Sequence, residues 1–352
     1  MNEVTARRWR NFKSNRRGYY SLWIFLTLFG TSLFAEFIAN DKPIIAVHEG
    51  QWFFPVLIEY TEKDLGGEFE MIADFRSPYV QRLLDGPDSW QVWPPIPFNY
   101  KTIDYQLEAP APAPPSARHL VGTDDGAKDT LARLIYGFRL SVAFGLALTV
   151  LASMIGILVG AVQGYYGGNV DLIGQRLVEI WQGLPILFVL IILASMVEPN
   201  VMWLLLILLL FSWTGLVGVV RAEFLRVRNF EFVRAAKAMG VSNVVIMWRH
   251  VLPNAMVATL TFLPFILNGS ITTLTALDFL GFGLPPGSAS LGELLAQGQA
   301  NVRAPWLGLT GFVVLATTLV LLIFVGEAVR DAFDPRKLVQ RQQQETGVFN
   351  PA

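Results

Sequence analysis

Long apolar runs separated by short polar segments dominate this chain. A helix needs about 20 mostly apolar residues to cross the hydrocarbon of a bilayer. Six runs reach that length, at residues 19–39, 140–163, 173–196, 201–220, 256–280 and 306–325. Because a membrane span must satisfy its backbone hydrogen bonds internally, each run predicts a helix. We therefore expect an all-α polytopic membrane protein with six transmembrane helices.

Two of these runs differ from the others. The run at 173–196 carries Gln175, Arg176 and Glu179 in its first turns, so its helix is predicted to begin near the membrane surface. The run at 19–39 is longer than the core of a signal peptide and is followed by no small-x-small cleavage site. We expect it to be a retained anchor.

The composition agrees with a membrane protein and excludes several function classes. Hydrophobic residues make up 53% of the chain and charged residues only 16%, against roughly 25% charged in soluble domains. The 27 basic and 28 acidic residues leave no basic excess for nucleic-acid phosphates. The chain contains no cysteine, so it forms no disulfide, thiolate metal site or cysteine nucleophile.

Lys and Arg cluster in three segments, and such residues are retained on the cytoplasmic side of a membrane. The N-terminal arm (residues 1–18) and the segment 221–255 carry six each, and the tail (326–352) carries Arg330, Arg336, Lys337 and Arg341. Six spans place all three segments on one side. We therefore expect both termini and the segment 221–255 in the cytoplasm, and the segment 281–305 outside.

The segment 221–255, here called the basic loop, is predicted to be ordered. Residues 231–239 have the pattern of a short helix, closed by Gly240 in a left-handed cap. A second helix is expected to begin at Ser242, whose side chain can accept a capping hydrogen bond, and to end at Pro253, which lacks an N–H. An ordered basic loop between two spans suggests a docking surface for a cytoplasmic partner.

Residues 40–118, here called the insertion, are expected to lie outside the cytoplasm. Apolar clusters around Trp52 and Trp90, together with Gly and Pro turn signals, predict a small, strand-poor folded unit. Residues 109–117 read as a polyproline-like spacer. The insertion is either a cap packed on the membrane part or a docking surface for an external partner, and the sequence leaves both open.

Residues 119–139 are predicted to form a surface helix that leads into the second span, with Thr123, Asp124 and Asp125 as N-cap candidates. A metal site at His119 is disfavoured, because the neighbouring acids serve better as caps. The three histidines, His48, His119 and His250, lie in separate segments. We therefore predict neither a catalytic site nor a metal site.

Five motifs, in order along the chain, resemble one transporter family. They are GTDDGAKDTLARLIYG, GAVQGYYGGNVDLIGQR, RAAKAMG with RHVLPN in the basic loop, LDFLGFGLPPGSASLGELL and VRDAFDPRK. This series is similar to the C-type permease subunits of oligopeptide and dipeptide ABC importers. WPPIPFNY and RAEFLRVRN look most like the Yej-type permeases, which are associated with uptake of peptides and microcin C.

The resemblance implies the type I ABC importer permease fold, with a permease core at residues 140–352 and the insertion between helices 1 and 2. It also implies a bacterial inner-membrane location, a second permease subunit in a heterodimer, cytoplasmic ATPases and a periplasmic substrate-binding protein. ATP and Mg are implied on the ATPases alone. This chain is expected to bind no cofactor and to be no enzyme, since it lacks the Gly-x4-Gly-Lys-Ser/Thr phosphate loop.

The resemblance also assigns an ATPase-coupling role to the basic loop. Small residues there leave a surface without protruding side chains, on which the groove of a partner protein can close. Arg226, Arg228 and Arg234 are expected to pair with acidic residues of that partner. Closing of the ATPases would then tilt the flanking spans and switch the path. Arg234 stands where the family usually has Glu, and Ala127-Lys128 replace its Gly-Arg pair. The coupling residues are Glu231, Arg234, Ala235, Ala236, Gly240, His250, Leu252 and Pro253.

The translocation path is predicted in the fifth span, where polar residues interrupt the apolar pattern: Asn268, Ser270, Thr272 and Thr273. A carboxamide facing lipid is costly, so Asn268 is expected to face protein or the path. Hydroxyls in membrane helices often bond only to their own backbone, which is the alternative for the other three.

Three further functions stay open as alternatives. These alternatives are a permease for another small cargo such as nickel, an ion-driven secondary transporter, and a membrane-tethered helix-turn-helix protein. A secondary transporter usually shows internal repeats, interrupted helices and acids at mid-membrane, which the sequence lacks. The segment 231–250 is enclosed by spans and too short for a packed DNA-binding domain. The peptide importer permease is preferred.

Overall fold

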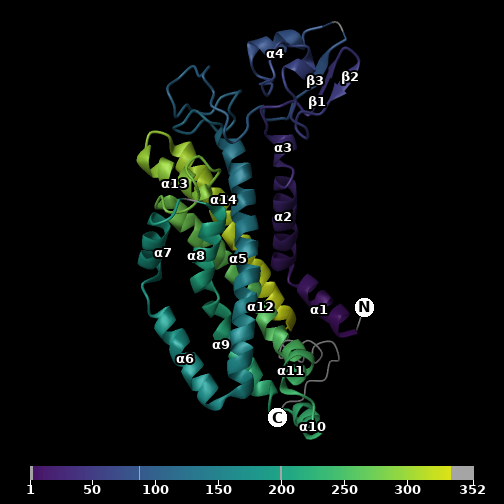
Figure 1. Cartoon of the computed structure of the whole chain (residues 1–352), viewed down its shortest axis with the longest axis vertical. Coiled ribbons are helices and arrows are strands. Elements are labelled where there is room, and N and C mark those ends of the chain that lie inside the picture. The colour runs from purple at the N-terminus through teal and green to yellow at the C-terminus, as the bar shows by residue number, and fades with distance from the viewer. Residues whose placement is uncertain (1–2, 87, 199, 334–352) are drawn as a thin grey trace, which may run out of the picture. The chain divides into compact units, whose positions relative to one another are not determined.

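The computed structural model of the chain is mainly helical and describes residues 3–86, 88–198 and 200–333 (Figure 1). In chain order its elements are α1 (Glu3–Ser14), α2 (Arg16–Ser32), α3 (Ala35–Ile38), β1 (Ile45–His48), β2 (Gln51–Phe53), η1 (Lys63–Leu65), α4 (Pro78–Leu83), β3 (Trp90–Val92), α5 (Thr130–Tyr166), α6 (Gly168–Gln182), α7 (Ile186–Ser195), α8 (Val201–Ser212), α9 (Thr214–Val227), α10 (Glu231–Ala238), α11 (Asn243–Val245), η2 (Ile246–Val251), α12 (Leu252–Phe279), α13 (Leu291–Ala300) and α14 (Pro305–Phe333).

Four helices within the described residues are long and apolar enough to cross a membrane. They are Thr130–Tyr166, Val201–Val227, Asn243–Phe279 and Pro305–Phe333, and the bent pair of α6 and α7 is a fifth candidate. The helical, polytopic character predicted from the sequence is therefore found. The first predicted span corresponds to α2, which has 17 residues and ends at Ser32 rather than at residue 39. Gly30, Thr31 and Ser32 are poor helix formers and occupy that end.

The span predicted at 173–196 is not one continuous helix. α6 ends at Gln182 and α7 begins at Ile186, and the two helices are bent by 68° at the break. Pro185 lies at this break. It cannot donate a backbone hydrogen bond, and it disfavours the helical conformation of the preceding Leu184.

The separate surface helix predicted at 119–139 is also wrong. Residues 119–129 form turns, and α5 runs from Thr130 to Tyr166 as one helix of 37 residues. Its N-cap is Asp129, whose Oδ1 accepts the N–H of Ala132 at 2.7 Å. Asp124 instead accepts the N–H groups of Gly126 and Lys128 within the preceding turn. Several residues here have capping chemistry, so the sequence placed the helix start too early.

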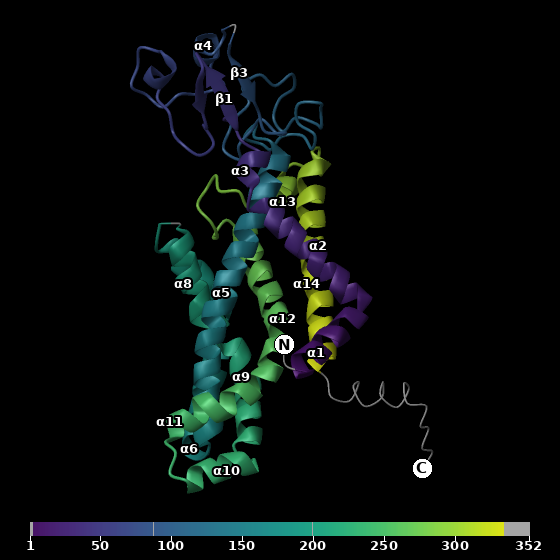
Figure 2. The same ribbon diagram turned by 90° about the vertical axis from the view of Figure 1, so that its right-hand side faces the viewer.

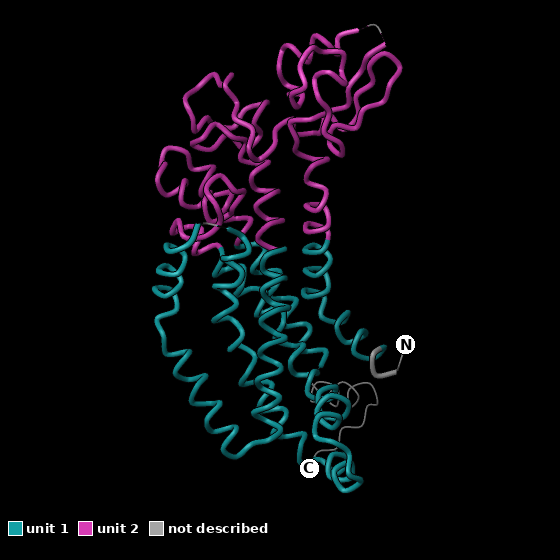
Figure 3. Tube along the Cα trace, viewed as in Figure 1, with its two compact units in different colours: residues 1–26, 143–274, 316–352 teal, residues 27–142, 275–315 magenta. Residues whose placement is uncertain are grey.

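The chain divides into two compact units, coloured separately in Figure 3. Unit 2 comprises residues 27–142 and 275–315 and contains the insertion. There β1 lies between β2 and β3 in an antiparallel sheet, with Ala46 opposite Phe53 and Val47 opposite Trp90. A small core of buried side chains supports this sheet: Ala46, Phe53, Leu65, Ala73, Phe75, Val80 and Leu84.

Unit 1 comprises residues 1–26, 143–274 and 316–352 and contains the basic loop. α10 and α11 lie at the end of this unit where α9 stops and α12 begins (Figure 2). Apolar side chains from α5, α9, α10 and η2 form its core there, including Val220, Phe224, Val233, Ile246 and Val251. The basic residues Arg336, Lys337 and Arg341, and the end of the VRDAFDPRK motif, lie outside the described residues.

Candidate functional site

The first half of the basic loop is an ordered helix with a left-handed cap. α9 continues to Val227, so the loop leaves the helix later than residue 221. α10 ends at Ala238, and Gly240 follows with φ of +77°. The N–H of Gly240 donates to the carbonyl of Lys237 at 3.0 Å, and that of Val241 to the carbonyl of Ala236 at 3.1 Å. This pair of bonds defines a Schellman cap, which requires positive φ and so favours glycine.

The second half differs from the prediction at both ends. Ser242 occupies the N-cap position of α11, but its side chain makes no capping hydrogen bond. Pro253 does not end the helix and lies in the first turn of α12. The preceding turn, η2, is a π-helix in which the N–H of Leu252 donates to the carbonyl of Met247, five residues back. We attribute the tolerance of Pro253 to this wider turn, which relieves the usual clash of a proline ring with the turn before it.

The basic loop exposes a set of apolar side chains in the single chain. Phe230, Phe232, Val244, Val245 and Trp248 are exposed, and Met239 is 75% exposed. Exposed apolar groups gathered in one segment mark a surface that another molecule covers. The predicted coupling residues Glu231, Arg234, Ala235 and Gly240 are exposed beside them, and His250 and Leu252 are half-buried. Ala236 is 3% exposed and packs in the core, so the prediction that it lies on the docking surface is wrong.

Two of the three arginines expected to meet a partner's acids are engaged within the chain. Arg228 donates to the carbonyls of Gly164 at 3.4 Å and Tyr165 at 3.3 Å, at the end of α5. Arg226 pairs with Glu223 at 2.6 Å, one turn away on α9. Arg234 makes no ion pair with a described residue. The helical extension of α9 places Arg228 against α5 and leaves Arg226 exposed beside Glu223. The sequence, interpreted as a loop, did not predict these contacts.

The segment GAVQGYYGG holds the basic loop to α5, a role that the sequence did not reveal. A Cβ on Gly160 would lie 2.7 Å from the carbonyl oxygen of Val217, and one on Gly164 would lie 2.5 Å from that of Arg221. Glycine at these positions therefore allows α5 to pack closely on α9. Tyr165 donates its hydroxyl to Oδ1 of Asn243 at 2.8 Å. In the sequence, the spacing of Gly160 and Gly164 was the signal that could have revealed this close packing.

The predicted path residues do not share one environment. Asn268 donates to the carbonyl of Leu319 on α14 at 2.9 Å, so its carboxamide is held by protein. Ser270 is buried and lies 3.4 Å from the hydroxyl of Thr149 on α5. Thr272 and Thr273 donate to carbonyls of their own helix. An open face of α12 consists of Gly269, Thr272 and Ala276, which are all exposed.

Sequence reasoning missed a buried charged cluster in unit 2, here called the Arg133 network. Arg133 of α5 pairs with Asp124 and, at 2.8 Å, with Glu293 of α13. It also donates to the carbonyl of Ser288 at 2.9 Å. Arg133 and Asp124 are both fully buried. The available signal was a basic and an acidic residue nine positions apart, which we assigned to a surface and to a helix cap.

His119 belongs to a second buried group in unit 2. Its Nδ1 lies 2.8 Å from Oδ2 of Asp129, and its Nε2 lies 3.0 Å from Oδ2 of Asp104. Both ring nitrogens are thus engaged by carboxylates, and Phe98 packs on the ring with centroids 4.4 Å apart. His119 joins three segments of unit 2, as a structural residue does.

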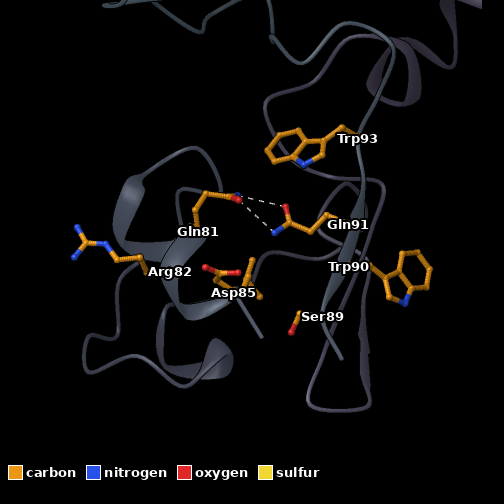
Figure 4. Close-up of a pocket in the computed structure, with 8 residues that line it drawn as sticks. Gln81, Arg82, Asp85, Ser89, Trp90, Gln91 and Trp93 are labelled. Carbon is orange, nitrogen blue, oxygen red and sulfur yellow. Dashed lines mark hydrogen bonds between the residues drawn. The ribbon is translucent and has the colours of Figure 1, made fainter. Parts of the chain in front are cut away.

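The insertion also carries an open pocket of about 450 Å³ between α4 and β3. Gln81 and Gln91 reach toward each other across it and are joined by hydrogen bonds of 3.3 and 3.4 Å (Figure 4). Trp93 lies on the same side as Gln91, and Arg82 extends from α4. On the sheet, Trp90 stacks edge-on with Trp52, and both are exposed. The insertion therefore presents aromatic surface to its surroundings.

Comparison with known proteins identifies relatives over nearly the whole length. The chain is 58% identical over 339 residues to the inner membrane ABC transporter permease protein YejE of Escherichia coli K12, covering 96% of this chain and 99% of the relative. It is 54% identical to the peptidoglycan transport system permease protein YejE of Agrobacterium fabrum, covering 95% and 93%. It is 33% identical to the oligopeptide transport system permease protein OppC of Haemophilus influenzae, covering 68% and 78%.

Among solved structures, an inward-facing form of the MetNI methionine ABC transporter matches with a TM-score of 0.46 and 16% identity, covering 57% of this chain and 96% of that one. A family model, binding-protein-dependent transport system inner membrane component, matches residues 152–339, which is more than half of the chain. The family resemblance seen in the motifs is confirmed: this chain belongs to the inner membrane permease components of binding-protein-dependent ABC transport systems.

Proposed function

We propose that this permease forms half of a path that carries peptides or peptide-like compounds inward, and that its basic loop binds an ATP-hydrolysing partner. The observation that carries the second part is the set of apolar side chains exposed on an ordered loop, with Phe232, Met239 and Trp248 among them. Permease subunits of this family are non-catalytic transmembrane components. ATP and Mg are accordingly proposed to bind to the partner.

The cargo class follows from what the relatives are named for. One is named for oligopeptide transport and another for peptidoglycan transport. Both cargoes contain short peptide chains, so we propose that the path accepts a peptide backbone. Microcin C, a peptide antibiotic, falls within the same class. The open face of α12, with Gly269, Thr272 and Ala276, supplies small and weakly polar side chains suited to a path that passes varied peptides.

Coupling is proposed to act through the two helices that flank the basic loop. α9 ends only four residues before α10 begins, and α11 passes through η2 into α12 with no break. A displacement of α10 by a partner would therefore reach both helices directly. Such a displacement can tilt packed helices between two arrangements, which switches access from one side to the other.

The full membrane topology is also proposed. Six spans result if α2, the α6 and α7 pair, and the four long helices each cross once, with both termini in the cytoplasm. Reporter fusions after Ala39 and Pro286 should then report the outside, and a fusion after Val220 the inside. A fusion after Pro286 that reports the cytoplasm would contradict this arrangement.

The insertion is proposed to contact a periplasmic substrate-binding protein. Its exposed Trp52 and Trp90, beside the pocket of Gln81 and Gln91, support this role, because aromatic residues are enriched at protein interfaces. Single cysteines at residues 41–118 should cross-link to that protein in whole cells. Cross-links that never reach it would make the insertion a passive cap.

Transport in vesicles tests the function as a whole. The purified chain, its second permease subunit and the ATPases are reconstituted together, and uptake of labelled peptides is measured with and without ATP. We expect uptake only with ATP and the ATPases present. Uptake driven by the permease without a nucleotide-hydrolysing partner would overturn the proposal.

A further inference from the structure

The N-terminal segment concentrates positive charge that forms no ion pair within the part of the chain that the structure describes. Six basic side chains lie between residues 7 and 17, and the nearest acids along the sequence are Glu3 and Glu36. None of the six makes an ion pair with a described residue. The exposed members are Arg7, Arg10, Lys13, Arg16 and Arg17.

The packing of α1 fixes which side chains face away from the protein. Phe12 is buried against Ala328 and Ala332 of α14. Arg8 lies over the ring of Phe333, 4.7 Å from its centroid. At 3.6 residues per turn, Arg7 and Arg10 point about 140° and 160° away from Phe12. The basic face of α1 is therefore held outward by a contact on the opposite face.

Aromatic side chains next to this face indicate its surroundings. Trp9 contacts Tyr19 with ring centroids 6.4 Å apart, and Tyr19 contacts Trp23 at 6.3 Å. Tyr20 and Trp23 are exposed, as are Ile24, Leu26 and Leu28 further along α2. Exposed Trp and Tyr at the end of an apolar helix are typical of the level of lipid headgroups. We propose that α1 and the first turn of α2 bind the headgroups of anionic phospholipids.

Lipid retention by the purified full chain tests this surface. Each Lys or Arg near an anionic surface contributes about 1 kcal/mol, or about fivefold in affinity. In bilayers of phosphatidylglycerol and phosphatidylcholine, the variant Arg7→Gln with Arg10→Gln should retain severalfold less phosphatidylglycerol after extraction. Arg7→Lys with Arg10→Lys should retain it fully, which separates loss of charge from loss of folding.

A matched variant controls for net charge. Arg226→Gln with Arg234→Gln also removes two charges, and both side chains are exposed on another segment. This pair should leave the retained phosphatidylglycerol unchanged. Equal retention by the Arg7 and Arg10 variant and the native chain would overturn the proposal, and so would an equal loss in the control.

A different observation, at the end of α5, carries a second inference. Tyr165 is 4% exposed, and its hydroxyl donates to Asn243 at the start of α11. The ammonium of Lys237, in the last turn of α10, lies 4.9 Å from the centroid of the same ring. One side chain outside the basic loop thus holds both of its short helices across the Gly240 turn.

We infer that Tyr165 is a positioning residue that transmits displacement of the basic loop to α5. This inference rests on the proposed function of the loop. The chain joins the loop covalently to α9 and α12 only, so α5 receives the motion through non-covalent contacts. Tyr165 supplies a directed hydrogen bond to the loop. The turn at Gly240 itself packs on nothing, because a Cβ added there would meet no atom within 4 Å.

The ratio of ATP hydrolysed to peptide transported tests Tyr165 in the assembled complex. Tyr165→Phe keeps the ring and removes one hydrogen bond, worth about 1 kcal/mol or about fivefold. We expect the ratio to rise up to fivefold while the ATPase still co-purifies. Tyr166→Phe is the matched control, because the neighbouring side chain is 49% exposed, and it should leave the ratio unchanged.

Substitutions of the partner residue complete the design. Asn243→Asp keeps an acceptor for the hydroxyl and should behave as the native chain, whereas Asn243→Leu should reproduce Tyr165→Phe. An unchanged ratio in Tyr165→Phe would overturn this inference alone. Failure of the native chain to bind the ATPase would instead overturn the proposed function of the loop.

Discussion

The basic loop in unit 1 and the Arg133 network in unit 2 use charge and apolar surface in opposite ways. Arg133 and Asp124 are fully buried and paired with each other. In the basic loop Arg234 is exposed without a described partner, and Phe232 and Met239 remain exposed. The network pairs its buried charges with described residues of the same chain, whereas the basic loop leaves surface that another protein can cover. The difference separates a region that maintains the shape of the chain from one that we propose to bind a partner.

Breaking the network should have the largest effect. Asp124→Ala would leave the buried guanidinium of Arg133 with Glu293 as its one remaining described ion-pair partner, and removing one partner of a buried ion pair costs about 3–5 kcal/mol. We expect a large fall in the thermal unfolding temperature of the purified chain. Arg234→Ala, on the exposed loop, should change stability by less than about 0.5 kcal/mol. Similar losses in both variants would remove the distinction between the two regions.

Backbone strain provides a matched comparison of the two units, with a smaller effect. Gly240 and Gly66 both adopt positive φ, +77° and +84°, and a Cβ on either would meet nothing within 4 Å. Valine at either position costs about 1–3 kcal/mol of strain. Gly240→Val should abolish co-purification of the ATPase or transport, because it distorts the cap between α10 and α11. Gly66→Val should retain both. Full activity in Gly240→Val would contradict the role of the cap.

The smallest expected effect concerns pH in unit 2. Burial raises the pKa of Asp104, but the N–H of Gln106 and the neighbouring His119 and Arg118 outweigh it, so this pKa lies below its ordinary value. A lowered pKa stabilises the fold above the pKa of the unfolded chain, about 4, and this contribution is lost as the pH falls through the folded pKa. Asp104→Asn should therefore weaken the acid destabilisation measured by thermal unfolding. Parallel pH profiles for both proteins would contradict this.

Local signals in the sequence were sufficient for α10 and its cap, because Glu231 begins a helical pattern and Gly240 supplies the positive φ that ends it. They failed where distant residues decide the outcome. Ala236 is buried because Phe224 and Ile246 form a core around it, and nothing in RAAKAMG specifies that contact. Likewise, the motif that contains Arg133 gave no sign that Glu293, on α13, would lie beside it.

Two further differences arose from proline. At Pro185 the chain breaks between α6 and α7, as the missing N–H predicts, but the apolar run continued through it and was assigned to one span. At Pro253 the expectation was the reverse, and the helix continues because η2 widens before it. The sequence pattern alone cannot tell whether a helix stops or continues at a proline, since this depends on whether the turn before the proline can widen.

Cross-linking from one exposed residue in each unit tests most directly whether the basic loop is the ATPase-binding surface. The chain contains no cysteine, so Met239→Cys and Tyr105→Cys each introduce a single reactive thiol. The two native side chains are similarly exposed, at 75% and 88%. In native membranes we predict a cross-link to the ATP-hydrolysing subunit from position 239 and none from position 105. A cross-link from position 105, or none from position 239, would contradict the assignment.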